Sequence, residues 1–284
     1  MRTTHSWTSN TATIHVEGLQ APVKMLHITD AHVSCIDDRD PEHVEACATH
    51  QARNVPREAF FHALMAEAAT QSLDLVALTG DIIHYPSQAA IESVDQAVAQ
   101  VDVPVVYTSG NHDWWYPHIK GREELRSVWW PMLDSLTKGQ ASHASYVVGG
   151  IQFILVDDST YQVTEEQLAF VQEKLKTDLP TVLLTHIPVS LPTLRDRTIE
   201  RWKDPILIGD PNWSVERRER WRTDADLPST LEFVRTLVAA DNLIAVFCGH
   251  IHFDHADTLS RSAVQYVGAP GFDAQKRLVE FLPL

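Results

Sequence analysis

Residues 103–113, VPVVYTSGNHD, join a short apolar run to a group of polar residues that can bind metal ions or transfer protons. The β-branched residues predict a buried strand, and Gly110 marks the point at which it ends. In open α/β sheets, residues at the carboxyl ends of strands line a crevice in which ligands bind. The stretch therefore predicts an element of the fold and a part of a functional site.

The same arrangement recurs elsewhere in the chain, where an apolar run leads directly into polar residues. MLHIT leads into Asp30-Ala31-His32, LVALT into Gly80-Asp81, TVLLT into His186, and IAVFC into Gly249-His250-Ile251-His252. Because the carboxyl ends of neighbouring strands converge, we expect these side chains to lie together although they are far apart in the sequence.

Taken singly, most of these blocks have a simpler explanation. Gly-Asp is an ordinary turn dipeptide, and His186 could be a packed core histidine. Only Gly-Asn-His-Asp and Gly-His-Ile-His favour a functional role by themselves, whereas the order and strand context of the whole set favour a shared site. His27, inside a strand, and His62, on an apolar helical face, are predicted to pack in the core.

The segments between these blocks predict an α/β chain. Helices near 56–72 and 88–100 separate three strands, which is a βαβαβ pattern with parallel neighbours. Gly149-Gly150 separates two further apolar runs and predicts a hairpin with a primed turn. Capping-box spacing predicts helix starts at Thr164 and Ser229, and an irregular segment at 188–227 lies between them.

Composition narrows the function classes. The chain has 284 residues, 44% of them apolar, and no internal repeat or linker, so we expect a single domain over residues 1–284. A net charge of −15 argues against general nucleic-acid binding and against anionic membrane surfaces. The sequence shows neither a signal-like apolar segment nor a run of about 20 apolar residues, so we expect a cytoplasmic location. Three cysteines without Cys-x-x-Cys spacing indicate neither disulfides nor a thiolate zinc site.

The five blocks together resemble the calcineurin-like metallophosphoesterase family, whose motifs run Asp-x-His, Gly-Asp, Gly-Asn-His-Asp/Glu, His and Gly-His-x-His in that order. The resemblance spans residues 28–253. It implies an α/β fold, a four-layer αββα sandwich with two mixed β-sheets flanked by helices.

The last block also has a competing interpretation. CGHIHFDH, residues 248–255, is similar to the His-x-His-x-Asp-His motif of the metallo-β-lactamase superfamily. That fold takes further ligands downstream of the motif, and no histidine follows His255. The metallophosphoesterase resemblance is therefore preferred.

The resemblance implies a dinuclear metal centre. One metal would be held by Asp30, His32, Asp81 and His252, and the other by Asp81, Asn111, His186 and His250. Asp81 would bridge the metals by giving one oxygen to each. These nitrogen and oxygen ligands suit two divalent or trivalent ions of Mn, Fe, Zn or Co.

The implied activity is hydrolysis of a small-molecule phosphoester, most simply a phosphodiester, with a metal-bridging hydroxide as the nucleophile. His112 would act as a general acid or transition-state stabiliser, and Asp113 would orient its ring. Two alternatives stay open: a phosphomonoesterase acting on a small phosphorylated metabolite, and a non-catalytic metal-binding scaffold of the same fold.

Three features near the blocks could shape the pocket. His84 follows Asp81 at the spacing where a purple-acid-phosphatase-like member has a metal-binding tyrosine, and we expect it behind the ligands or in the pocket wall. Trp114, Trp115 and Tyr116 are either pocket walls or core residues. The segment 195–222 carries three tryptophans and seven arginines. It predicts a cap, inserted at about 188–227, in which an arginine could receive a substrate phosphate or carboxylate.

Overall fold

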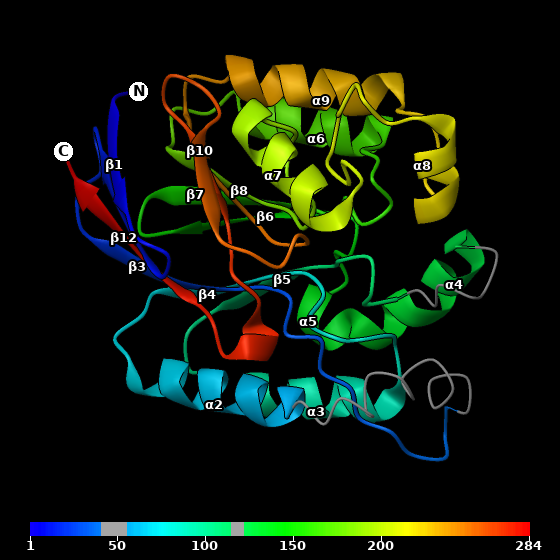
Figure 1. Cartoon of the computed structure of the whole chain (residues 1–284). Helices are drawn as coiled ribbons and strands as arrows, with labels where there is room; N and C mark the ends of the chain where they lie inside the picture. The colour runs from blue at the N-terminus through cyan, green and yellow to red at the C-terminus, as the bar shows by residue number, and fades with distance from the viewer. Residues whose placement is uncertain (41–55, 115–121) are drawn as a thin grey trace.

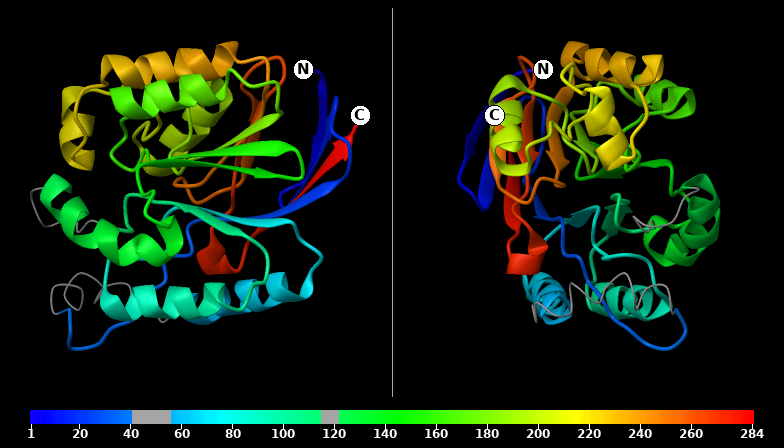
Figure 2. Two further views of the ribbon diagram at one scale, coloured as in Figure 1. Left: turned by 180° about the vertical axis from the view of Figure 1, so that it is seen from behind. Right: turned by 45° about the vertical axis from the view of Figure 1, so that its right-hand side comes forward.

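The computed structural model describes residues 1–40, 56–114 and 122–284. Within them, two six-stranded sheets face each other, and helices cover the outer face of each sheet (Figure 1). Both chain termini lie at the end of the sandwich away from α4 and α8 (Figure 2). Of the helices in these ranges, none has the length and apolar composition needed to span a bilayer.

The first sheet contains the predicted βαβαβ unit. Its order is β1-β2-β12-β3-β4-β5, and β3, β4 and β5 are parallel neighbours. The strands are β1 (Thr3–Trp7), β2 (Thr11–Val16), β3 (Val23–Ile28), β4 (Leu75–Thr79), β5 (Val105–Thr108) and β12 (Arg277–Pro283). The crossover helices α2 (Arg57–Thr70) and α3 (Gln88–Val98) agree with the predicted ranges.

The second sheet has the order β10-β11-β9-β8-β7-β6. Its strands are β6 (His143–Val148), β7 (Ile151–Val156), β8 (Thr181–Leu184), β9 (Leu243–Cys248), β10 (His255–Thr258) and β11 (Val264–Val267). The predicted hairpin is confirmed, since β6 and β7 are antiparallel and both turn residues, Gly149 and Gly150, have positive φ. Helices α6 (Glu165–Lys174) and α9 (Pro228–Ala239) cover this sheet, and the capping box at Thr164 is present.

Strand alternation explains the four layers. In β4, Leu75 and Ala77 pack between the sheets, whereas Val76 and Leu78 pack against the cluster that includes α2 and α3. In β7, Phe153 faces the other sheet and Ile154 faces the α6 and α9 side. Each fully buried apolar side chain of this size contributes about 2 kcal/mol of transfer free energy. The predicted αββα sandwich with two mixed sheets is therefore confirmed.

Two predictions of local structure were wrong. The segment 188–227 is not irregular throughout, because it contains α7 (Pro192–Trp202) and α8 (Val215–Trp221). Pro192 stands at the start of α7, and the buried residues Leu194 and Thr198 are four positions apart, so the helix has one narrow packed face among charged residues. Ser229 does not cap α9, because the helix begins at Pro228 and the Ser229 hydroxyl donates to the Val163 carbonyl at 2.7 Å.

One of the remaining helical elements, the 3₁₀ turn η2 (Gly271–Asp273), lies at the end of the molecule where the motif-bearing strands end, since Gly271 N–H donates to the Thr29 carbonyl at 2.8 Å. In contrast, α5 (Asp134–Thr137) packs against β5, and its Ser135 bonds Asp95. The others in the described ranges are α4 (Arg122–Trp129) and the 3₁₀ turn η1 (Trp130–Leu133). Figure 1 shows α7 and α8 above the end that carries the motifs and η2, α2 and α3 below it.

Candidate metal centre

The loops after β3, β4 and β9 bring four predicted ligands together. His32 Nε2 lies 3.1 Å from His252 Nε2 and 3.7 Å from Asp81 Oδ2, and His252 Nε2 lies 3.4 Å from Asp30 Oδ1. All four residues can offer a ligand atom within 4.8 Å of the others. We call Asp30, His32, Asp81 and His252 the first donor group.

A second donor group, Asp81, His186 and His250, meets the same criterion. Asp81 Oδ2 lies 3.1 Å from His186 Nε2. Asn111 lines the same cavity as Asp81 and His250, and its Oδ1 is buried without a hydrogen-bond partner among the described residues. A buried oxygen left without a donor suits a cation as its partner. The structure therefore brings together all seven predicted ligand residues.

The two carboxylate oxygens of the shared residue Asp81 have different contacts. Its Oδ1 accepts the backbone N–H of His112 at 2.7 Å, whereas Oδ2 faces both His32 and His186. Oδ2 is therefore the Asp81 oxygen that lies near histidines of both donor groups.

The donor groups fit metal ions on two physical grounds. The carboxylates of Asp30 and Asp81 are buried, with 0% and 1% exposure, and buried anions require a compensating charge. In addition, separations of 3.1–3.7 Å between donor atoms match ligands arranged about 2 Å from one ion. Nitrogen and oxygen donors without sulfur suit Mn, Fe, Zn or Co.

The pKa values of His186 and Asp81 indicate that this cluster favours positive charge. Burial alone would lower the pKa of His186, but the charges of Asp81 and Asp30 and the contact with Asp81 raise it to about 10. Burial would raise the pKa of Asp81, yet His186 and His112 hold it well below its usual range. The buried carboxylates thus favour positive charge at this position, and a cation bound there would compete with a proton on His186.

Five of the predicted ligand residues have unusual backbone conformations. Asp30, His32, Asp81, His250 and His252 have φ of 51°, 48°, 51°, 73° and 56°. Residues other than glycine rarely adopt this left-handed region, and each costs on the order of 1 kcal/mol. Strain of this kind persists where the surrounding structure over-determines the conformation, most often at functional sites.

Crowding explains two of the motif glycines. Gly80 has φ of +80°, and a Cβ there would lie 2.6 Å from His186 Nδ1. A Cβ on Gly249 would overlap the Thr29 hydroxyl and the Asp30 carboxylate. Any side chain at either position would displace a predicted ligand, so glycine is required by the site as well as by the turn.

The Asp113 carboxylate has different contacts from those predicted. Its carboxylate accepts backbone N–H groups of Asp81, Ile83 and Gly110 at 2.8, 2.7 and 2.6 Å. Because both oxygens are used in this way, Asp113 ties the loops after β4 and β5 together and does not orient the His112 ring. Burial, together with the charge of Asp81, raises the pKa of Asp113 to about 7 against the opposing effect of these N–H groups.

Sequence reasoning missed two supporting residues. Asp158, two residues after the end of β7, accepts the N–H groups of His186 and Ile187 at 3.0 and 3.1 Å and so holds the loop after β8. Tyr161 Oη lies 3.0 Å from His250 Nε2, which leaves His250 Nδ1 for a cation. The available signal was Asp157-Asp158 directly after a buried strand, the same pattern as in the recognised blocks.

His112 lies beside the donor groups and lines their cavity. Its ring centroid is 4.8 Å from that of His32 and stacks at 4.9 Å on His84 and at 5.0 Å on Tyr85. Its Nδ1 has no hydrogen-bond partner in the described ranges. Burial lowers the pKa of His112.

The cavity over the donor groups has a volume of about 490 Å³. Besides His112 and five of the predicted ligand residues, it is lined by Arg57, His84, Arg201, Trp202, Ile206, Trp221, Phe272 and Asp273. Trp114 is not a wall of this cavity: it is 1% exposed and its indole N–H donates to Ser159 Oγ. Trp115 and Tyr116 lie outside the described residues.

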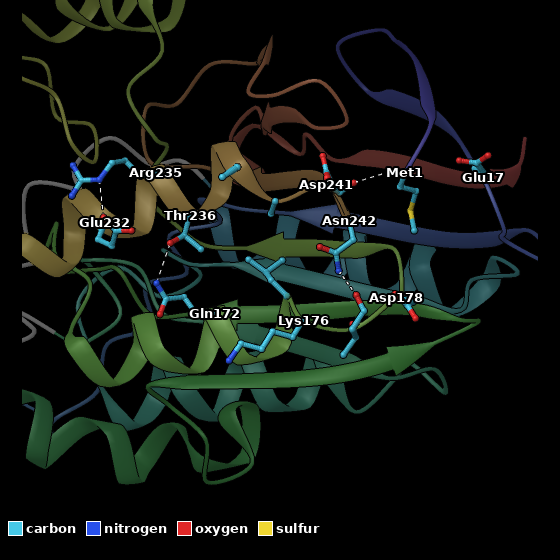
Figure 3. Close-up of a pocket in the computed structure, with 14 residues that line it drawn as sticks. Met1, Glu17, Gln172, Lys176, Asp178, Glu232, Arg235, Thr236, Asp241 and Asn242 are labelled. Carbon is cyan, nitrogen blue, oxygen red and sulfur yellow. Dashed lines mark hydrogen bonds and ion pairs between the residues drawn. The ribbon is translucent and has the colours of Figure 1, made fainter.

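A larger hollow of about 830 Å³ lies elsewhere, bordered by α6, α9 and the N-terminal residues (Figure 3). Its labelled residues include Gln172, Glu232, Arg235 and Asn242, which hydrogen-bond or pair with neighbours around its rim. It shares no residue with either donor group. Volume alone therefore does not mark the functional site.

The fold is an αββα sandwich, and the carboxylate, imidazole and amide groups at its strand ends could hold metal ions of the kind that a metal-dependent hydrolase uses. The chain belongs to the calcineurin-like phosphoesterase family, whose profile matches residues 23–254. This finding confirms the resemblance drawn from the five blocks.

Individual relatives agree with the family. The chain is 25% identical over 231 residues to a "Probable cyclic nucleotide phosphodiesterase" of Fibrobacter succinogenes, covering 81% of this chain and 73% of that protein. A dimetal phosphatase from Danio rerio superposes with a TM-score of 0.53 at 13% identity, covering 89% of each chain. A purple acid phosphatase from yellow lupin seeds superposes with a TM-score of 0.54 at 13% identity, covering 92% of this chain and 46% of that one. The two solved structures share the fold.

Proposed function

We propose that the chain is a dinuclear metal-dependent phosphodiesterase that holds one ion in each donor group. The observation that carries the proposal is the position of Asp81 Oδ2 between His32 Nε2 and His186 Nε2, beside a cavity of about 490 Å³. The relative named as a probable cyclic nucleotide phosphodiesterase supports a diester substrate over a monoester.

The protein residues would divide the work as follows. Asp30, His32 and His252 would hold one ion, Asn111, His186 and His250 the other, and Asp81 both. When bound, two ions supply a water nucleophile at neutral pH and neutralise charge on the phosphoryl oxygens. His112, in the wall of the cavity, would donate a proton to the leaving oxygen or stabilise charge that develops there. Asp113 and Asp158 would keep the ligand loops in register through their backbone hydrogen bonds.

Metal content and substrate preference test this function together. We expect purified protein to carry two transition-metal ions per chain by elemental analysis, to lose turnover after chelation, and to regain it with Mn, Zn, Fe or Co. Bis(p-nitrophenyl) phosphate should then be hydrolysed with at least about tenfold higher kcat/KM than p-nitrophenyl phosphate, a difference of about 1.4 kcal/mol in transition-state stabilisation. A monoester preference would identify a phosphatase, and no metal with no turnover under any loading would leave a scaffold.

We also propose that segment 188–227 caps the cavity. Arg201, Trp202, Ile206 and Trp221 from this segment line the cavity. The Trp202 indole N–H donates to the Ile251 carbonyl at 2.9 Å, and its ring lies 5.4 Å from that of His252. These contacts attach the end of α7 to the loop that carries two ligands.

Arg201 is the cap arginine best placed to meet substrate. Other arginines of the cap have partners: Arg195 with Asp196, Arg197 with the Asp254 carbonyl, Arg217 and Arg220 with Asp204, and Arg218 with Asp226. Arg201 lines the cavity and forms no ion pair within the described part of the chain. We propose that it receives an anionic group of the substrate.

The change Arg201→Ala should raise KM by about tenfold, which corresponds to about 1.4 kcal/mol, for a phosphodiester that carries a second anionic group. KM for aryl phosphodiesters that carry no charge besides the diester phosphate should change little. Arg195→Ala is the matched control, because Arg195 lies on the same helix, pairs with its neighbour and does not line the cavity. An equal effect of both variants, or an equal loss on both kinds of substrate, would count against the role of Arg201.

A further inference from the structure

His32 uses its two ring nitrogens in opposite directions. Nε2 faces the other members of the first donor group, 3.1 Å from His252 Nε2. Nδ1 lies 2.9 Å from Nδ1 of His84. Both rings are buried, with 2% and 1% exposure, so water is largely excluded from this contact.

The contact between the two rings constrains the positions of their protons. If Nε2 of His32 offers its lone pair to an ion, a neutral His32 must carry its hydrogen on Nδ1. That hydrogen points at His84 Nδ1, which must therefore accept it. His84 in turn carries its own hydrogen on Nε2, so a single hydrogen bond sets the tautomer of both rings.

The backbone holds the two rings at this distance. Val33 and Ile83 form a parallel bridge between the loops after β3 and β4. His32 N–H donates to the Asp81 carbonyl, and His84 N–H donates to the Val33 carbonyl, each at 2.8 Å. The spacing of His84 from Asp81 thus places it directly behind His32.

We propose that His84 is a positioning residue that fixes the tautomer and ring orientation of His32 and thereby sets the metal affinity of the first donor group. The proposal rests on the proposed dinuclear centre. A partner that accepts the distal N–H of a metal-binding histidine raises the basicity of that ligand and holds its ring in place. Here the acceptor is an imidazole, where a carboxylate or a backbone carbonyl usually serves.

A different role for His84 is that of a ligand. His32, His84 and His112 could also surround an ion. That group contains no carboxylate, whereas the first donor group contains Asp30 and Asp81. Because His32 can share one lone pair only, an ion is held more strongly by Nε2 among two buried anions than by Nδ1 among neutral rings. The geometry therefore favours His84 as the hydrogen-bond acceptor.

Three substitutions at His84 separate these roles. His84→Phe keeps the bulk and removes the acceptor. His84→Asn replaces Nδ1 by an amide oxygen close to the same position, and His84→Ala removes the ring without adding steric overlap. Titration of metal-free protein with Mn²⁺ in a calorimeter should give two binding steps for the wild type. His84→Phe and His84→Ala should weaken one step by about 10- to 100-fold and leave the other within about threefold, and His84→Asn should restore most of the loss.

Several outcomes would overturn the inference. Unchanged affinities in His84→Phe and His84→Ala would show that His32 needs no acceptor, and failure of His84→Asn to restore affinity would point to packing alone. Wild-type binding of a third ion that is lost in every His84 variant would make His84 a ligand. His62→Phe is the matched control, since His62 lies on α2 and bonds Ser93 outside both donor groups. If the wild type itself bound no metal, the proposed function would fail first and in a distinguishable way.

Discussion

Replacing Asp81 by asparagine is expected to reduce bound metal below two ions per chain and to lower kcat/KM for a phosphodiester by about 10³-fold or more, equivalent to about 4 kcal/mol. Asp81 belongs to both donor groups, and its Oδ2 lies 3.7 Å from His32 Nε2 and 3.1 Å from His186 Nε2. An amide at this position removes the negative charge that both ions share. The measurement is elemental analysis of the purified variant together with steady-state kinetics under saturating Mn²⁺.

The matched control for this prediction is Asp273→Asn. Asp273 lines the same cavity, so Asp273→Asn removes one negative charge there as Asp81→Asn does, but Asp273 belongs to neither donor group. It should keep two ions and most of the turnover. If Asp81→Asn retained both ions, or if the two variants lost the same activity, Asp81 would not be the shared ligand.

The convergence of the seven predicted ligand residues could be foreseen from the sequence for a physical reason. A strand buried on both faces reads as a continuous apolar run, as in LVALT and IAVFC, and a polar residue directly after it must lie at the sheet edge. Because β3, β4 and β5 are parallel, as are β8 and β9, their carboxyl ends meet. Local pattern and chain direction were enough to bring Asp30, Asp81 and His186 together.

Pairings between distant segments could not be predicted in this way. β12, near the C-terminus, lies between β2 and β3, so the first sheet is completed by strands more than 240 residues apart in the sequence. β1 and β2 are short and rich in threonine and histidine, and their strand character depends on this pairing. The helices of segment 188–227 were hidden by charged residues around a narrow buried face.

Side-chain direction was the other gap. Gly-Asn-His-Asp predicts that Asp113 is close to the ligands, which is correct, but sequence distance does not determine the direction of its carboxylate. The loops after β4 and β5 leave backbone N–H groups of Asp81, Ile83 and Gly110 without ladder partners, and the buried carboxylate satisfies all three. The need of these buried N–H groups for hydrogen-bond acceptors therefore determines the direction of the Asp113 carboxylate.

Replacing His112 by alanine is expected to keep both ions and to lower kcat by about 10²- to 10⁴-fold, the usual contribution of a positioned acid. His112 lines the cavity, and its Nδ1 has no hydrogen-bond partner within the described residues, so the ring is held by stacking on His84 and Tyr85 and by the backbone bond to Asp81. His255→Ala is the matched control, because His255 does not line this cavity.

The identity of the leaving group distinguishes the two roles open to His112. p-Nitrophenolate departs without needing a proton, whereas an alkoxide must be protonated as it leaves. If His112 is the general acid, His112→Ala should lose at least about tenfold more activity on an alkyl phosphodiester than on bis(p-nitrophenyl) phosphate. Equal losses on both substrates would assign His112 to stabilisation of transition-state charge. Full activity of His112→Ala on both substrates would show that His112 takes no part in the chemical step, so that solvent protonates the leaving oxygen. Loss of a metal ion from His112→Ala would show that His112 acts on metal binding and not on the chemical step.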